Sequence, residues 1–200
     1  MTTYQRTPLT SIHEVAKNSF IFEKPQALEP ALCEEMIRRF EAHTEEQYPG
    51  RIGQQAEEDT SIKKSTDLVL SGKEHWKDLD HALFSSIAVA LKEFREAYPF
   101  FKGPFRDMGY AIQRTNPGEH YHWHIDGGSH EFSARQLVAV WYLNDVAGPG
   151  GETEFIFQDV KVKPEQGKLA LFPPFWTHDH RGVTLEQGVK YIATTWIVFG

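Results

Sequence analysis

Residues 119–128, EHYHWHIDGG, place two histidines and an aspartate at alternate positions: His122, His124 and Asp126. In a β-strand, side chains two residues apart point to the same face of the sheet. An extended run here would therefore present several potential metal ligands side by side. Because an H-x-D spacing also arises by chance, the rest of the chain must supply further ligands before this run indicates a metal site.

Beyond about residue 105 the chain consists of short β-like runs separated by turn residues. The separators NPGE, DVAGPGGE, PEQG and LEQG are rich in glycine, proline and acidic or amide residues. About eight strands are expected here: MGYAIQRT, HYHWHI, QLVAVWYL, TEFIF, VKVKP, KLALF, THDHRG and KYIATTWIVF. Many short strands without intervening helices predict an antiparallel double-stranded β-helix, or jelly roll.

The first half, about residues 1–104, is predicted to be mostly helical support with a variable loop. Pro30 opens one expected helix, whose apolar residues recur at helical spacing. Residues 75–98 predict a long amphipathic helix that ends before Pro99. Between them, residues 45–66 are polar and irregular, which suits either a surface loop or a lid. We expect a single domain over residues 1–200, with the helices on the outer face of a sheet and a catalytic core over about 105–200.

Composition narrows the classes of partner. The formal net charge is −7, and phosphate binding depends on clustered Lys and Arg, so nucleic acid is an unlikely partner. The only cysteine, Cys33, excludes an internal disulfide and is expected to be buried packing rather than a nucleophile. No apolar run approaches the roughly 20 residues of a membrane span. These features predict a cytoplasmic protein without a membrane partner, and they leave its oligomeric state open.

Further potential ligands lie in the segment FPPFWTHDHRG, which contains His178 and His180. Two imidazoles and one carboxylate on one face of a metal leave three coordination positions open, an arrangement that suits non-haem Fe(II). A structural zinc site would instead use four protein ligands, usually including thiolates. Two alternatives stay open from the residues alone: a cupin-like set of His122, His124 and His180, and His178 as the distal ligand.

Four segments give the chain a specific family resemblance. They are NPGEHYHWHID (116–126), WYLNDVAGPGGETEF (141–155), VKPEQGKLALFPP (162–174) and HRGVTLEQGVKYIATTW (180–196). From about Asp107 to the C-terminus the chain resembles the catalytic core of the Fe(II)/2-oxoglutarate-dependent dioxygenases. The resemblance is to the prolyl 4-hydroxylase-like branch, and the segments occur in that family's order.

This resemblance implies a role for particular residues. His124, Asp126 and His180 would be the iron ligands and the catalytic residues. Lys190 would pair with the far carboxylate of 2-oxoglutarate, and the hydroxyl of Thr153 would donate to the same carboxylate. The branch often carries a tyrosine nine residues before the first ligand, where this chain has Thr115.

Because the threonine at that position is shorter than the tyrosine, we expect Tyr110 or Gln113 to reach 2-oxoglutarate in its place. The cofactors implied are Fe(II), 2-oxoglutarate and O₂, with ascorbate as an optional reductant.

The resemblance further implies a dioxygenase that hydroxylates an unactivated C–H bond and releases succinate and CO₂. Peptidyl or free proline is the first expected substrate. Another amino acid or a small metabolite comes next, and a nucleic-acid demethylase last. Two other classes remain as alternatives: a cupin-type dioxygenase or isomerase that does not use 2-oxoglutarate, and a non-catalytic jelly-roll binding module.

The remaining polar and aromatic residues near the ligands are expected to orient ligands, contact the substrate or fill the core. His122 and His178 are expected to orient a ligand or the substrate. Arg181 would meet an anionic substrate or be a solvated strand residue. Trp176 is the best candidate for a wall of the substrate site, and Trp123 should face away from the metal. The other aromatic residues are expected to fill core: Tyr121, Trp141 and Trp196.

Overall fold

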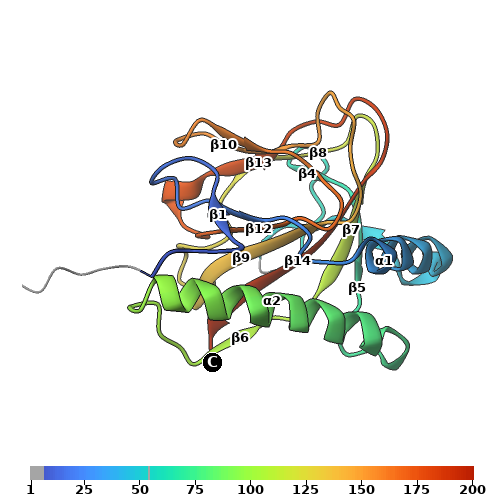
Figure 1. Ribbon diagram of the computed structural model, residues 1–200. Coiled ribbons are helices and arrows are strands. Elements are labelled where there is room, and N and C mark those ends of the chain that lie inside the picture. Colours follow the sequence, from blue (N-terminus) through green and yellow to red (C-terminus); the bar gives the residue numbers. More distant parts are fainter. Residues whose placement is uncertain (1–6, 54) are drawn as a thin grey trace, which may run out of the picture.

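The computed structural model describes residues 7–53 and 55–200. In this part of the chain, a larger and a smaller antiparallel sheet lie one above the other (Figure 1). The larger sheet contains, in spatial order, β1 (His13–Glu14), β2 (Phe22–Lys24), β12 (Leu169–Phe172), β9 (Arg135–Tyr142), β14 (Lys190–Phe199), β7 (Ala111–Thr115), β5 (Thr66–Val69) and β3 (Tyr48–Pro49), with β6 (Phe105–Asp107) beside β14. The smaller sheet contains β11 (Val160–Val162), β10 (Thr153–Phe155), β13 (His180–Gly182), β8 (His120–His124) and β4 (Lys63–Lys64).

The helices lie beside the larger sheet, with α2 crossing beneath it (Figure 1). Their bounds are α1 (Pro30–Ala42) and α2 (Lys77–Ala97), with short 3₁₀ turns η1 (Thr44–Glu46), η2 (Glu74–Trp76) and η3 (Trp176–His178). Both expected helices are confirmed: α1 begins at Pro30, and α2 ends two residues before Pro99. None of the described helices is long and apolar enough to cross a membrane.

Strand alternation divides the buried residues between two hydrophobic clusters. In β9, Leu137, Ala139 and Trp141 pack in the cluster that also contains the buried faces of α1 and α2. The intervening residues Val138, Val140 and Tyr142 belong to a second cluster, which includes residues of the smaller sheet such as Phe155. The larger sheet is therefore covered on one face by helices and on the other by the smaller sheet.

Cys33 belongs to the helix-side cluster and is fully buried. Burial raises the pKa of its thiol to about 11, so the reactive thiolate is scarce at neutral pH. This placement is consistent with the expectation that Cys33 is a buried core residue rather than a nucleophile.

The first half contains both expected helices, but it also contains the strands β1 to β5, which the sequence did not predict. Each has only two to four residues, too few to show the alternation by which a strand is recognised in sequence. Their partners lie far away in the chain: β5 pairs with β7, and β4 pairs with β8. In the second half, all eight predicted runs contain an observed strand.

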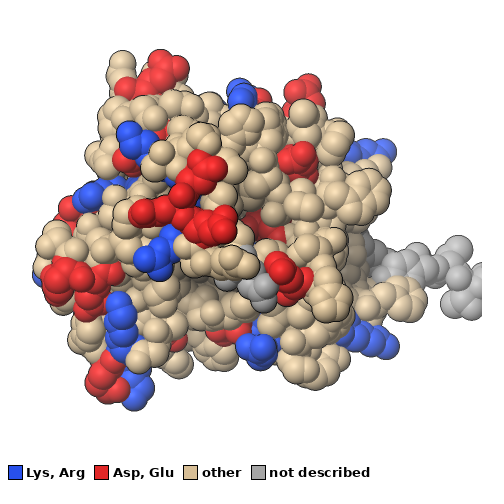
Figure 2. Space-filling model, turned by 180° about the vertical axis from the view of Figure 1, so that it is seen from behind, with Lys and Arg blue, Asp and Glu red and all other residues tan. Residues whose placement is uncertain are grey.

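Figure 2 shows the charged side chains on the face of the molecule opposite to that of Figure 1. Acidic and basic residues are interspersed there, without a broad basic area on the described part of that face. The expectation that nucleic acid is not a partner stays a prediction.

A substitution in α2 tests how much the helix-side core contributes to stability. Ile87 is 2% exposed, whereas Val89 on the same helix is 59% exposed. We expect Ile87→Ala to lower the free energy of unfolding by about 2–5 kcal/mol, because it removes buried methyl groups and leaves a cavity. Val89→Ala should change it by less than about 0.5 kcal/mol. Urea unfolding measures both, and equal losses would contradict the assignment of the buried face.

Candidate metal centre

His124, Asp126 and His180 are brought together by the pairing of β8 with β13. His124 lies directly opposite His180 in the register, and Asp126 follows two residues after the end of β8. One ligand atom from each of the three residues lies within 4.8 Å of the others. Asp126 Oδ2 lies 3.2 Å from His180 Nε2 and 4.0 Å from His124 Nε2. The side chains predicted to share a metal ion therefore converge on one point.

Backbone carbonyls orient both imidazole rings. His124 Nδ1 lies 2.8 Å from the carbonyl oxygen of His122, and His180 Nδ1 lies 2.9 Å from that of His178. A carbonyl can only accept, so each Nδ1 carries the proton and each Nε2 keeps its lone pair. Metal-binding histidines are held in this way in many proteins, with the second ring nitrogen donating to a fixed acceptor.

The backbone around Asp126 is equally constrained. Its carbonyl oxygen accepts a hydrogen bond from Arg135 Nη1 at 2.7 Å, and its N–H donates to the carbonyl of Pro174 at 3.1 Å. The Arg135 guanidinium is itself held between the rings of Phe132 and Trp196, at 4.0 and 3.8 Å from their centres. These contacts fix the carboxylate against the two histidines. No spacing in the sequence pointed to Arg135.

The charge states of the cluster match those of a metal site. Burial and, to a smaller extent, the nearby His180 lower the pKa of His124 to about 3, against the attraction of Asp126. Burial alone would raise the pKa of Asp126, but the hydrogen bond with His180 and the nearby His124 hold that pKa below its ordinary value. At neutral pH the cluster therefore offers a neutral imidazole at His124 and an ionised carboxylate, the forms in which these groups bind metals.

His122 lies outside this cluster, contrary to the expectation that it shares the face of His124. His180 pairs with His124, but Gly182 pairs with Tyr121, so β8 contains an extra residue and a bulge at this point. A bulge interrupts the alternation of faces. Tyr121 and His124 stack at 3.5 Å between ring centres, whereas His122 is exposed. The cupin-like set of three histidines is not assembled.

His178 is not part of the cluster either, because both of its ring nitrogens are already engaged. Nε2 lies 2.9 Å from the carbonyl oxygen of Ser19, and Nδ1 lies 2.9 Å from Thr177 Oγ1. His178 instead contributes its carbonyl, which orients His180. Of the two histidines in this segment, only His180 joins the candidate metal centre.

A cavity of about 130 Å³ extends from this cluster between the two sheets. Lys190, Thr115 and Thr153 all line it, and Lys190 pairs directly with Thr115 in the register of β14 and β7. The Lys190 ammonium is buried and donates to the carbonyl of Gly151 at 2.9 Å. It forms no salt bridge with any described residue. Burial lowers the pKa of Lys190 to about 8, although Glu152 partly opposes this.

Tyr110 lies on the wrong face to reach this cavity, which corrects one expectation. Tyr110 and Ile112 are buried in the helix-side cluster, whereas Gln113 and Thr115 line the cavity. Strand parity explains the difference, since residues 113 and 115 share a face that residue 110 does not. A tyrosine that was not considered, Tyr142, lies near instead: its hydroxyl is 2.7 Å from Thr153 Oγ1.

The segment 45–66 contributes to the cavity wall through Arg51, Lys63 and Ser65. Lys63 lies in β4, which pairs with the ligand strand β8, and its ammonium is 2.6 Å from the buried carboxylate of Asp67. The strands β3, β4 and β5 join the described ends of this segment to the two sheets. Trp196 also lines the cavity. It is six residues after Lys190 in β14, and strand residues an even number apart share a face, so the sequence could have predicted its position.

Trp176 and Arg181 lie outside the described cavity wall. The Trp176 side chain is 71% exposed on η3, so the structure does not place it as a wall of the pocket. Arg181 Nε donates to Glu154 Oε2 at 2.5 Å, and its guanidinium lies 4.7 Å from the ring centre of Trp123. Arg181 and Trp123 therefore contact each other and point away from the metal ligands, as expected for Trp123.

Comparison with known proteins agrees with this geometry. A family model for the 2OG-Fe(II) oxygenase superfamily matches residues 110–198. The transmembrane prolyl 4-hydroxylase of Homo sapiens is 28% identical over 43% of this chain, and that of Mus musculus is 27% identical over the same share. The chain spans only 28% of the length of these two relatives.

Similar solved structures are also prolyl hydroxylases. A viral collagen prolyl hydroxylase from Paramecium Bursaria Chlorella virus-1, in its 2OG complex, has a TM-score of 0.68 at 19% identity, covering 94% of this chain and 100% of that one. A prolyl hydroxylase from Trichoplax adhaerens, in complex with a hypoxia inducible factor peptide fragment, has a TM-score of 0.76 at 14% identity, covering 90% and 84%. A prolyl 4-hydroxylase from Pseudomonas putida has a TM-score of 0.68 at 19% identity, covering 90% and 93%.

The matched segment includes His124, Asp126, His180 and Lys190. Proteins of this superfamily use Fe(II), 2-oxoglutarate and O₂, and the neutral and anionic donors found here are ones that Fe(II) accepts. Residues 110–198 thus match the model of the 2OG-Fe(II) oxygenase superfamily, and the similar proteins found by sequence and by structure are prolyl hydroxylases.

Proposed function

We propose that this protein is an Fe(II)- and 2-oxoglutarate-dependent dioxygenase that hydroxylates an unactivated C–H bond and releases succinate and CO₂. One observation carries the proposal above the others. The His124–Asp126–His180 cluster and the buried ammonium of Lys190 line the same narrow cavity. A molecule with a metal-chelating end and a carboxylate at its other end satisfies both features at once.

His124, Asp126 and His180 would hold the iron through Nε2, a carboxylate oxygen and Nε2. The iron, when bound with O₂, supplies the oxidising chemistry that no side chain of the protein can provide. The protein contributes orientation, since the carbonyls of His122 and His178 prevent both rings from turning.

Lys190 would pair with the far carboxylate of 2-oxoglutarate, in a setting where a charge-assisted hydrogen bond is strong. An unpaired buried ammonium is costly, so the apo protein is prepared for an anionic partner. Thr153 is within reach of the same end of the cavity and is oriented by Tyr142. Thr115 lies opposite Lys190. Val138, Val140 and Phe172 add apolar wall that excludes water from the co-substrate.

The architecture of this proposal is a jelly roll made of the two facing sheets, with α1 and α2 as its support. Residues 1–200 would form a single domain, with residues 105–200 as the catalytic core. The sharing of strands supports this, because β4 and β5 of the first half pair with β8 and β7 of the second.

For the substrate we propose peptidyl or free proline, or another amino acid or small molecule of similar size. The similarity to prolyl hydroxylases supports this choice, and one of the similar structures has a peptide bound. A cytoplasmic location stays a prediction.

The proposal is tested by measuring succinate formed from 2-oxoglutarate by the purified protein with Fe(II) and O₂, with peptidyl and free proline as substrates. Succinate coupled to hydroxyproline is the expected result. The cupin alternative predicts activity that persists in Asp126→Ala and is indifferent to Lys190→Ala. The binding-module alternative predicts that Fe(II) and Mn²⁺ do not bind tightly at all.

Binding of 2-oxoglutarate should weaken above pH 8. The pKa of Lys190 in the free protein is lowered by burial to about 8, and only the protonated ammonium can pair with the carboxylate. Affinity is therefore full below pH 8, and it falls by roughly tenfold for each pH unit well above that value. Calorimetric titration with 2-oxoglutarate, using Mn²⁺ in place of iron, measures this effect. A dissociation constant that does not change between pH 7 and about pH 9.5 would contradict the role of Lys190.

A further inference from the structure

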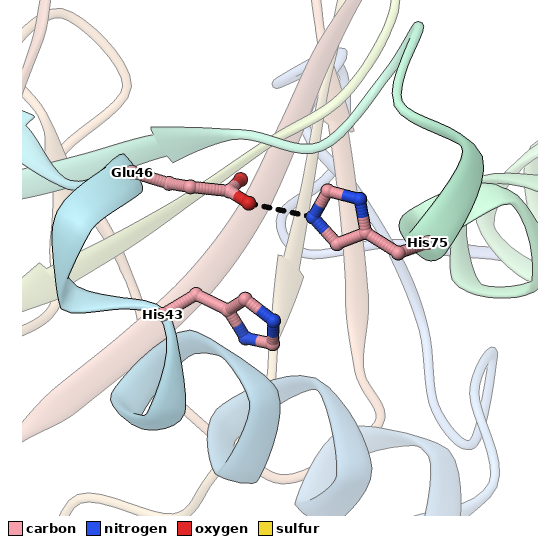
Figure 3. Close-up of side chains that lie close together, drawn as sticks. All are labelled: His43, Glu46 and His75. Atoms are coloured by element: carbon pink, nitrogen blue, oxygen red, sulfur yellow. Dashed lines mark hydrogen bonds and ion pairs between the residues drawn. The ribbon is translucent and has the colours of Figure 1, made fainter.

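A second group of potential metal ligands lies on the helix side of the molecule, apart from the cavity. His43 caps the C-terminal end of α1, Glu46 lies in η1, and His75 lies in η2. One ligand atom from each residue lies within 4.8 Å of the others. Figure 3 shows the Glu46 carboxylate and the two imidazole rings turned toward one another. None of these residues lines the cavity of the candidate iron centre.

The His43 ring is held in the same way as the candidate iron ligands. Its Nδ1 lies 2.9 Å from the carbonyl oxygen of Arg39, so this nitrogen carries the proton and Nε2 keeps its lone pair. The pattern repeats that of His124 and His180, each of which donates from Nδ1 to a backbone carbonyl. A fixed tautomer of this kind prepares the free nitrogen for a metal ion.

The two oxygens of Glu46 have different partners. Oε2 accepts hydrogen bonds from the ammonium of Lys73 and from Trp76 Nε1, whereas Oε1 lies 2.6 Å from His75 Nε2. Burial alone would raise the pKa of Glu46, but these donors outweigh it and lower the pKa to about 2. The carboxylate is thus ionised and turns Oε1 toward the histidines. Lys73 opposes a cation electrostatically, so we expect weaker binding here than at the candidate iron centre.

The backbone that carries the three ligands is also preorganised. Arg39 Nη1 donates to the carbonyl of His75 at 3.1 Å, and the Arg39 guanidinium forms a two-pronged ion pair with Asp78 at 2.8 and 2.6 Å. The rings of His43 and His75 are nearly parallel, with centres 5.4 Å apart. The C-terminal end of α1 carries partial negative charge, which favours a cation beside His43.

We propose that His43, Glu46 and His75 bind a divalent transition-metal ion of the Zn²⁺ class, with water completing its coordination. Tetrahedral zinc binds such ligands at about 2.0–2.2 Å, which puts the ligand atoms about 3.3–3.6 Å apart. Donors now within 4.8 Å of one another reach that spacing by rotation of exposed or half-buried side chains. The ion replaces the direct contact between His75 and Glu46.

Such an ion would connect three elements that the sequence separates. It would join the end of α1 to the turn that precedes α2, and both to η1. The chain continues from η1 into residues 48–65, which supply Arg51 and Lys63 to the cavity wall. The site is therefore structural: it anchors the base of the segment that forms part of the cavity wall.

The test is the number of Zn²⁺ ions bound per chain, measured by equilibrium dialysis of the full-length protein. We expect two ions in the wild type, one in His75→Ala and one in the double variant His124→Ala/His180→Ala. His75→Ala is suitable because that side chain is 49% exposed, so its removal does not open a cavity in the hydrophobic core. Zn²⁺ should also raise the melting temperature of the double variant, and this increase should be lost when His75→Ala is added.

Two further variants distinguish loss of the site from misfolding and from nonspecific Zn²⁺ binding. Glu46→Gln keeps a side chain that can accept from Trp76 but removes the anionic ligand, so it should also bind one ion fewer. His13→Ala is the matched control, because His13 Nε2 lies 3.8 Å from Glu23 and no third ligand lies beside them among the residues that the structure describes. This variant should bind as many ions as the wild type.

Two results would overturn the second site: no Zn²⁺ bound by the His124→Ala/His180→Ala protein, or full binding by folded His75→Ala and Glu46→Gln. The outcome is separable from the proposed function. One ion in the wild type and none in His75→Ala would support the second site and contradict the iron centre instead.

Discussion

His124→Ala is expected to reduce conversion of 2-oxoglutarate to succinate by more than about a hundredfold. Mutation of a residue that merely orients a metal ligand commonly costs 10–100-fold in affinity or activity, so loss of a ligand itself should cost about that much or more. His124 supplies one of three converging donors, and the remaining pair cannot hold iron in the same geometry. Succinate release under saturating Fe(II) and 2-oxoglutarate measures the effect.

His122→Ala is the matched control for this substitution. His122 is an exposed histidine two residues away in the same strand, and it orients His124 only through its backbone carbonyl. The alanine variant keeps that carbonyl, so it should retain nearly all of the wild-type activity. Equal losses in the two variants would indicate damage to β8 rather than loss of a ligand.

Lys190→Met is expected to raise the KM for 2-oxoglutarate by roughly thirtyfold to a thousandfold or more. Removing one partner of a buried charge pair costs about 2–5 kcal/mol, and each 1.4 kcal/mol is about tenfold in affinity. The kcat at saturating 2-oxoglutarate should change much less, because the iron ligands are untouched. The melting temperature of the apo protein should be unchanged or higher, since its buried ammonium has no carboxylate partner among the described residues.

Lys168→Met separates this effect from the general cost of replacing a buried lysine. Lys168 is buried like Lys190, but its ammonium lies 3.0 Å from Glu23 and 3.2 Å from Glu165. Its loss removes the lysine partner of Glu23, so we expect lower stability and an unchanged KM for 2-oxoglutarate. An unchanged KM in Lys190→Met would remove that residue from the co-substrate site.

Much of the second half of this fold could be predicted from sequence because local signals are strong there. Strands such as β9 and β14 are long enough to show alternation, and turns rich in Gly and Pro separate them. Alternation also grouped His124 with Asp126 as a hypothesis, and the family resemblance added His180. The choice of His180 over His178 came from the family spacing to Lys190, and the structure groups His180 with the other two residues.

Other features depend on contacts between distant segments and could not be predicted in this way. The bulge in β8 arises from its pairing with β13, so strand parity alone misplaced His122. The short strands β4 and β5 exist because they pair with β8 and β7. The cluster of His43, Glu46 and His75 joins residues about 30 positions apart, with no motif in the chain to connect them. The placement of Tyr110 is different, because parity along β7 was sufficient to exclude it from the cavity.

The most direct test of the proposed function is a crystal structure of the protein grown with Mn²⁺ and 2-oxoglutarate, with the metal located by anomalous diffraction. We predict a metal peak bonded to His124 Nε2, His180 Nε2 and an Asp126 carboxylate oxygen. The far carboxylate of 2-oxoglutarate should lie within hydrogen-bonding distance of Lys190 Nζ. A peak bonded to a different set of side chains, or 2-oxoglutarate bound away from Lys190, would contradict the account.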